Sequence, residues 1–277
     1  MKKSKLAFIA AMLMLSSCAP RVAVKPIPAD TPPYRIIKMA SAGTENIKGF
    51  KAFVKVTAQA KGKGPQSMDG VLYFEKPDRF RFTGLAFMGF TVFDLVLTSD
   101  KFYFYRPSEG WLYTGPRESF RKFLAKNGIQ ADPEIIGRAL FMEKSEGDEF
   151  LAEKSDDGYD IYQARVAPGI LLPRMKAQYD AGLNLKEKTF YDSLARPYLY
   201  VTMSGKGREV LAVAGKAGAA GTETVPSAAL PASLTARDVA HDMLLTVDFD
   251  KYIVNPEGLD NDFTIEGAQF KGIREVK

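Results

Sequence analysis

The chain has 277 residues, of which 46% are hydrophobic and 26% are charged, and this is an ordinary globular composition. Its length suffices for one large β domain or two small ones. The formal charge of +5 includes three lysines of an N-terminal targeting segment; the other 35 basic and 33 acidic residues show no clustered basic surface, so no nucleic-acid partner is expected.

The N-terminus has the pattern of a bacterial export signal. A basic segment at residues 2–5 precedes an apolar run at residues 6–15, which is shorter than the roughly 20 residues that span a bilayer. The following Leu-Ser-Ser-Cys, which ends at Cys18, resembles the lipobox of bacterial lipoproteins. We therefore expect residues 1–17 to be a lipoprotein signal peptide and Cys18 to be acylated. A secretory signal with an incidental cysteine is the alternative.

Residues 18–33 are expected to form a lipidated, proline-rich tether. At ~3.1 Å per residue, a partly polyproline II segment could hold the domain up to roughly 50 Å from a membrane. Cys18 is the only cysteine, so after acylation no thiol is left for a disulfide, a nucleophile or a metal. Ala19 rather than Asp follows it, and the likeness to Gram-negative lipoproteins then predicts an outer-membrane anchor with the protein facing the periplasm.

The domain is expected to span residues 34–277 and to begin with a short helix at residues 33–40. A strand at residues 50–60 leads into a series of short aromatic and β-branched runs at residues 68–114. Phe80 alternates with Arg81, and Phe102 with Tyr103, in runs bounded by turn residues. Period-2 alternation of this kind predicts an antiparallel meander with two unlike faces.

The loop at residues 84–90 carries unusually many large apolar residues. Leu85, Phe87 and Met88 lie between two predicted strands, where exposed apolar groups are uncommon unless they bind something. Two interpretations stay open. Either the loop contacts a membrane or acyl chains, or it folds under the sheet as core or continues a strand.

Two short amphipathic helices are predicted at residues 116–126 and from Pro133 onward. They form either a lid on the concave side of the sheet or a layer on its outer face. The acidic residues 143–160 are expected to be a solvated turn region, since their spacing does not match a calcium-binding loop. Strands resume at residues 158–204, an Ala/Gly-rich mobile loop is expected at 213–234, and late strands are expected at 243–249 and from Phe263.

The sequence offers little for catalysis. His241 is the only histidine, there is no Gly-x-Ser-x-Gly or phosphate-binding motif, and the usual zinc ligand sets cannot be assembled. We therefore expect no enzyme, no cofactor and no metal site.

The order of these segments resembles the periplasmic lipoprotein carrier and outer-membrane acceptor family, the LolA/LolB-like fold. The resemblance rests on the lipobox, the tether, a short helix, alternating strands, two helices and further long strands; Phe80 to Gly84 followed by the apolar loop is similar to a strand and loop of the acceptor. It implies a mainly β (α+β) single domain, in which an incomplete antiparallel barrel of roughly ten strands wraps around a few short helices. It also implies an apolar cavity for acyl chains and a protruding residue at Phe87 or Met88.

The expected function is that of a lipid-anchored carrier or acceptor, in lipoprotein sorting to the outer membrane. Its partners would be the membrane, lipid or lipoprotein acyl chains, and a periplasmic carrier protein. The alternative is a structural lipoprotein that scaffolds an envelope complex without lipid cargo. The residues expected to line the acyl cavity are Phe80, Phe82, Phe93, Leu95, Phe102, Phe104, Phe123 and Ile136.

Overall fold

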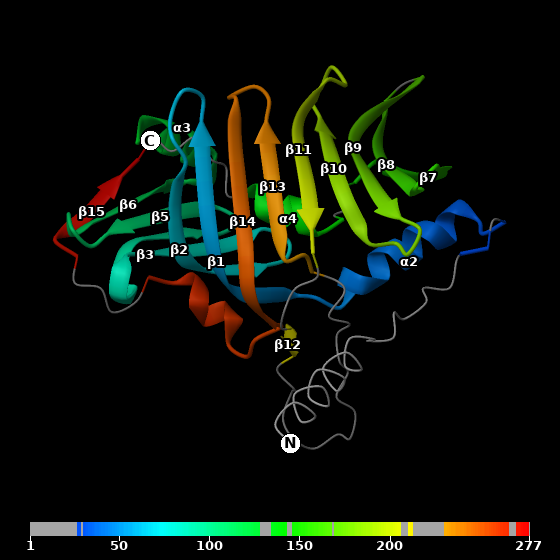
Figure 1. Ribbon diagram of the computed structural model, residues 1–277. Helices are drawn as coiled ribbons and strands as arrows, with labels where there is room; N and C mark the ends of the chain where they lie inside the picture. Colours follow the sequence, from blue (N-terminus) through cyan, green and yellow to red (C-terminus); the bar gives the residue numbers. More distant parts are fainter. Residues whose placement is uncertain are drawn as a thin grey trace, which may run out of the picture.

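The protein is built around one strongly curled, open β-sheet (Figure 1). A computed structural model describes residues 27–28, 30–127, 134–142, 146–167, 169–205, 210–212, 230–265 and 270–276. Within them the sheet has fifteen strands, in the order β15-β6-β5-β4-β3-β2-β1-β14-β13-β11-β10-β9-β8-β7, with β12 paired to β14 beside this path. The expected mainly β, incomplete-barrel single domain is confirmed, with more strands than the roughly ten anticipated.

Neighbouring strands are antiparallel except for two short parallel pairs, β12 with β14 and β15 with β6. The strands of the first half are β1 (Gly49–Ala60), β2 (Gln66–Glu75), β3 (Arg79–Leu85), β4 (Thr91–Leu97), β5 (Lys101–Arg106) and β6 (Trp111–Pro116). Those of the second half are β7 (Asp148–Ser155), β8 (Gly158–Ala167), β9 (Ile170–Asp180), β10 (Leu185–Tyr191), β11 (Pro197–Ser204), β12 (Val210–Ala212), β13 (Ser233–Asp238), β14 (Met243–Val254) and β15 (Gly272–Glu275).

The helices are short and few. They are α2 (Pro33–Glu45), α3 (Phe120–Lys126) and α4 (Glu134–Leu140), with 3₁₀ turns η1 (Phe87–Gly89), η2 (Arg117–Ser119) and η3 (Leu259–Phe263). In Figure 1, α3 and α4 lie behind the central strands, while α2 runs along the lower end of β9 and β10. The buried side chains of α3 and α4 belong to the main core cluster. The two helices therefore fill the concave side of the sheet, and the outer-layer alternative does not hold.

Alternation along the strands sets the two faces of the sheet. Phe50, Ala52 and Val54 of β1 are buried, whereas Phe53 and Lys55 between and beyond them are exposed. The pairing of β1 with β14 joins residues about 200 positions apart along the chain, from Phe50 opposite Val254 to Ala60 opposite Met243. This non-local ladder connects the two halves of the sheet.

Three expectations from the sequence need correction. The acidic stretch contains the strand β7: Phe150 and Ala152 pack inward, while Glu149 and Glu153 are exposed, and charge of this kind is common on a strand at a sheet edge. Phe263 was expected to begin the last strand, but it ends η3, where it packs with Leu259 against Val96 on the outer face; the last strand is β15.

The third correction concerns the Ala/Gly-rich loop. Leu230 and Leu234 are buried, and Ser233 opens β13, so the loop does not extend to residue 234. Residues 213–229 lie outside the described residues, as do the signal peptide at 1–17, Cys18 and the tether as far as residue 26.

Candidate functional site

The eight predicted cavity residues do come together on the concave side of the sheet. Phe80, Leu95, Phe102, Phe104, Phe123 and Ile136 are buried, and Phe82 and Phe93 are partly buried against the same cluster. Ring centroids are 5.6 Å apart for Phe82–Phe93 and Phe93–Phe104, 5.4 Å for Phe104–Phe123 and 5.0 Å for Phe102–Phe123. At these separations the rings are in contact. The predicted wall is thus a close-packed aromatic cluster beneath α3.

The backbone of α4 packs closely against the same core at Gly137. A Cβ at Gly137 would lie only 2.3 Å from a ring atom of Phe74, so only glycine lets the helix lie this close. At the end of α4, the buried ammonium of Lys188 donates hydrogen bonds to the carbonyl oxygens of Arg138 (3.0 Å) and Phe141 (2.6 Å). These bonds partner carbonyls that a helix C-terminus leaves without intrahelical donors.

The apolar hairpin tip between β3 and β4 is exposed. Phe87, Met88 and Phe90 have 90%, 79% and 69% of their surface accessible, while Leu85 at its base is half-buried. The tip is closed by two backbone hydrogen bonds, from the Ala86 N–H to the Phe90 oxygen (2.8 Å) and from the Gly89 N–H to the Ala86 oxygen (3.0 Å). Of the two interpretations of this loop, the structure supports exposure.

Met88 lies in the left-handed region, with φ of 66°. That conformation costs a side-chain-bearing residue about 1 kcal/mol, whereas glycine or asparagine adopts it readily. A large apolar residue that is both strained and solvated does not stabilise the fold by itself.

A pocket of about 400 Å³ lies between α2, the end of α4 and the β9–β10 turn. The residues that line it are Met39, Ala40, Ala42, Gly43, Thr44, Leu140, Met142, Tyr179, Gly182, Leu183, Asn184 and Leu185. The Tyr179 hydroxyl lies 3.4 Å from the Met142 sulfur, and burial raises the pKa of Tyr179 above its ordinary value, so the group is neutral. The lining is therefore largely apolar and carries no charge.

No local sequence pattern indicates this pocket. The residues that line it come from three segments that are far apart in the chain. Met39 and Met142 are the members whose flexible side chains are typical of an adaptable apolar surface. Two further pockets that open on the described surface are lined by other residues, and of the predicted site residues only Leu85 lines any of the three.

The ion pair between Arg81 and Asp94 links the neighbouring strands β3 and β4. Arg81 donates to Asp94 through Nε (3.0 Å) and Nη2 (2.6 Å), and through Nη1 to the Asp262 carbonyl oxygen (2.7 Å). Burial opposes the charge of Arg81, but the hydrogen bonds and attraction from Asp94 raise its pKa overall. His241 lies on the surface with Nδ1 2.8 Å from Asp238.

The described part of the chain contains no group of three or more His, Cys, Asp and Glu side chains placed to hold a metal ion. Within the same residues, no helix has both the length and the hydropathy that crossing a bilayer requires.

No family model matches the sequence, and no curated protein matches it. Solved structures do resemble the fold. A LolA superfamily protein from Nitrosomonas europaea aligns over 84% of this chain and 98% of its own, with 9% identity and a TM-score of 0.51. A putative outer membrane lipoprotein-sorting protein domain from Vibrio parahaemolyticus aligns over 84% and 96%, with 11% identity and a TM-score of 0.54. A DUF1329 family protein from Desulfovibrio piger aligns over 86% and 99%, with 11% identity and a TM-score of 0.55.

These likenesses extend over nearly the whole length of each neighbour. At 9–11% identity they concern the fold, and they show that the open, curled sheet is a LolA-like half-barrel. A shared fold does not fix a function, so the function has to be argued from the hairpin, the core and the pocket.

Proposed function

We propose that this chain is a lipid-anchored carrier or acceptor, facing the periplasm from the outer membrane, that shelters an acyl chain in its half-barrel. It acts by binding, not by catalysis. Its partners are the membrane, the acyl chains of a lipid or lipoprotein, and a periplasmic carrier protein that delivers them in lipoprotein sorting. The observation that carries this proposal is the exposed apolar hairpin tip.

The energetics of the hairpin tip support contact with an apolar medium. Full transfer of a Phe or Met side chain out of water contributes about 1.5–3 kcal/mol each. Even partial burial of Phe87 and Met88 would contribute about 3 kcal/mol, which corresponds to roughly a hundredfold in affinity. Neither side chain gains this energy within the domain, because both are exposed.

The pocket under α2 is the proposed acyl site. Its volume of about 400 Å³ lies within the range of roughly 300–1,000 Å³ that is usual for small-molecule sites. Its apolar lining favours a hydrocarbon chain. The aromatic cluster under α3 is filled by its own side chains, so we assign it to the core of the half-barrel.

The test uses a secreted, unlipidated variant that begins at Ala19 and carries Phe87→Glu and Met88→Glu. Exposed substitutions usually change the free energy of unfolding by no more than about 0.5 kcal/mol each, so this protein should fold normally. We expect its binding to liposomes, measured by co-flotation, to fall at least tenfold. The matched control is Leu194→Glu, which places a carboxylate on another exposed apolar turn residue. Undiminished liposome binding by the double variant would contradict the role of the hairpin.

A structural lipoprotein that scaffolds an envelope complex is the second candidate. The close packing of the predicted cavity wall favours it, because a core filled by its own side chains needs no cargo. The two candidates differ in bound lipid. Lipid extracted from protein purified under mild conditions, together with uptake of a fluorescent fatty acid, supports the carrier, and the absence of both supports the scaffold.

A further inference from the structure

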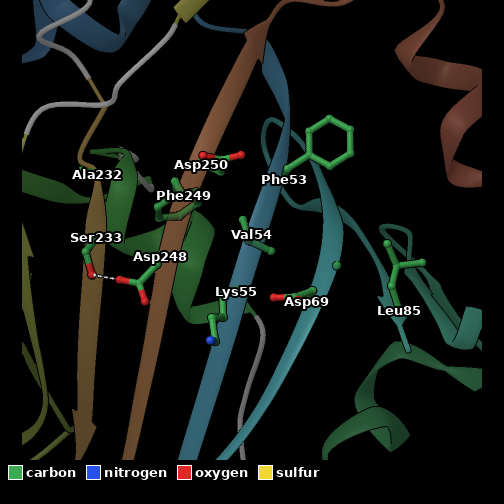
Figure 2. A pocket seen from close by; sticks show the side chains of 11 residues that line it. Phe53, Val54, Lys55, Asp69, Leu85, Ala232, Ser233, Asp248, Phe249 and Asp250 are labelled. Carbon is green, nitrogen blue, oxygen red and sulfur yellow. Dashed lines mark hydrogen bonds between the residues drawn. The ribbon is translucent and has the colours of Figure 1, made fainter. Parts of the chain in front are cut away.

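A hollow of about 620 Å³ lies on the outer face of the sheet, opposite α3 and α4. Figure 2 shows its side chains rising from β13, β14, β1 and β2, with Leu85 of β3 at one side. The residues that line it are Phe53, Val54, Lys55, Asp69, Gly70, Leu85, Ala232, Ser233, Asp248, Phe249 and Asp250. None of the predicted acyl-cavity residues belongs to it, so it is a separate feature of the fold.

The hollow is acidic. Three carboxylates, those of Asp69, Asp248 and Asp250, line it with a single ammonium, that of Lys55. Lys55 lies directly opposite Asp69 in one ladder and opposite Asp248 in the other. Among the described residues none of the three carboxylates forms an ion pair, and Asp248 accepts one hydrogen bond, from Ser233 (2.7 Å). Among the residues that the structure describes, Lys55 and Ser233 therefore balance the negative charge of the hollow only in part.

An exposed aromatic ring stands beside these carboxylates. The β1–β14 ladder shifts register between Phe53 and Val54, which lie opposite Lys251 and Phe249, so Asp250 is an extra residue in β14. Such a bulge increases local twist and redirects side chains. Phe53 is left 43% exposed in the middle of the outer face, and Figure 2 shows it near Asp250 at one end of the hollow.

An aromatic group next to carboxylates in a concave surface suits a ligand that is both apolar and cationic. A phospholipid surface fits poorly, because its phosphates would face three carboxylates. A basic polypeptide fits well: an apolar side chain can pack on Phe53 and Leu85 while lysine or arginine meets Asp69, Asp248 and Asp250. Complementary charge of this kind directs association and partner choice more than it adds affinity.

We propose that the outer-face hollow docks a partner protein through a segment in which basic residues alternate with large apolar ones. This surface shares no lining residue with the acyl pocket, and Leu85 connects it to the base of the β3–β4 hairpin. It gives the protein a protein-binding face directed away from the helices in the half-barrel.

The test measures fluorescence anisotropy of a labelled Lys-Leu-Lys-Leu-Lys peptide with the full chain, at low and at physiological ionic strength. A Glu-Leu-Glu-Leu-Glu peptide is the control probe. The variants are Phe53→Ser and the double change Asp248→Asn with Asp250→Asn. The matched control is Asp156→Asn with Asp157→Asn, which removes two carboxylates from the β7–β8 turn. Fluorescence of the single tryptophan, Trp111, verifies that each variant is folded.

We expect the basic peptide to bind and the acidic one not to bind, with affinity falling as salt rises. Affinity should drop about fivefold or more in each hollow variant and stay unchanged in the turn control. The proposal is overturned if the basic peptide fails to bind at millimolar concentration, or if both hollow variants bind it as wild type does. It is also overturned, in favour of a membrane, if the hollow variants lose binding to phosphatidylglycerol vesicles and not to the peptide.

Discussion

Replacing Phe102 by alanine tests whether the aromatic cluster is a packed core or the wall of an open cavity. Phe102 has no exposed surface, and its ring centroid lies 5.4 Å from that of Phe120 and 5.0 Å from that of Phe123. A wall residue that faces an opening would lack neighbours on one side. Here α3 provides those neighbours, so the truncation leaves a void enclosed by protein.

The expected loss follows from this enclosure. Phe→Ala changes at buried sites lower the free energy of unfolding by about 3–5 kcal/mol, through lost burial and the cavity left behind. With two ring contacts, Phe102 is expected near the middle of that range, at about 4 kcal/mol. With a urea m-value of about 3 kcal/mol/M, the midpoint should fall by roughly 1 M.

The assay is urea unfolding followed by both Trp111 fluorescence and far-ultraviolet circular dichroism. Phe53→Ala is the matched control, because it removes the same side chain from the exposed face and should change stability by less than about 1 kcal/mol. A loss below about 1 kcal/mol for Phe102→Ala, with uptake of a fluorescent fatty acid enhanced, would show that the cluster borders open space and refute the packed-core argument.

Three further predictions concern the pocket, the buried lysine and the β9–β10 turn. Ala40→Phe should fill part of the pocket under α2 and weaken binding of a fluorescent fatty acid at least fivefold, measured by titration, with a near-normal melting temperature. Lys188→Met should lower the free energy of unfolding by about 1–3 kcal/mol in urea titration, because the carbonyls of Arg138 and Phe141 lose a buried donor. Burial raises the pKa of Asp180, but hydrogen bonds from Asn184 and Gly182 outweigh this and lower it overall. Asp180 therefore stabilises the fold above its ordinary pKa, and Asp180→Ala should be less stable than wild type at pH 7, with a difference that shrinks in thermal melts as pH falls below about 4.

Much of the sheet was determined by the sequence alone. The alternation of Phe80 with Arg81 and of Phe102 with Tyr103 placed the phenylalanines on one face, because side chains on a strand alternate at period two. The two helices after the meander were predicted from their apolar stripes. The same local signals marked residues 84–90 as a loop between strands that carried too many apolar groups for an ordinary turn.

Only the tertiary structure decided which apolar groups are covered. Phe102 and Phe87 are the same residue type and both lie in apolar segments. In the described protein, α3 packs against Phe102, whereas Phe87 is left exposed. The pocket under α2 and the outer-face hollow depend on segments brought together from distant parts of the chain, the hollow through the pairing of β1 with β14. Period and propensity act over a few residues, whereas burial, cavities and charge balance are set by contacts between segments that lie far apart in the sequence.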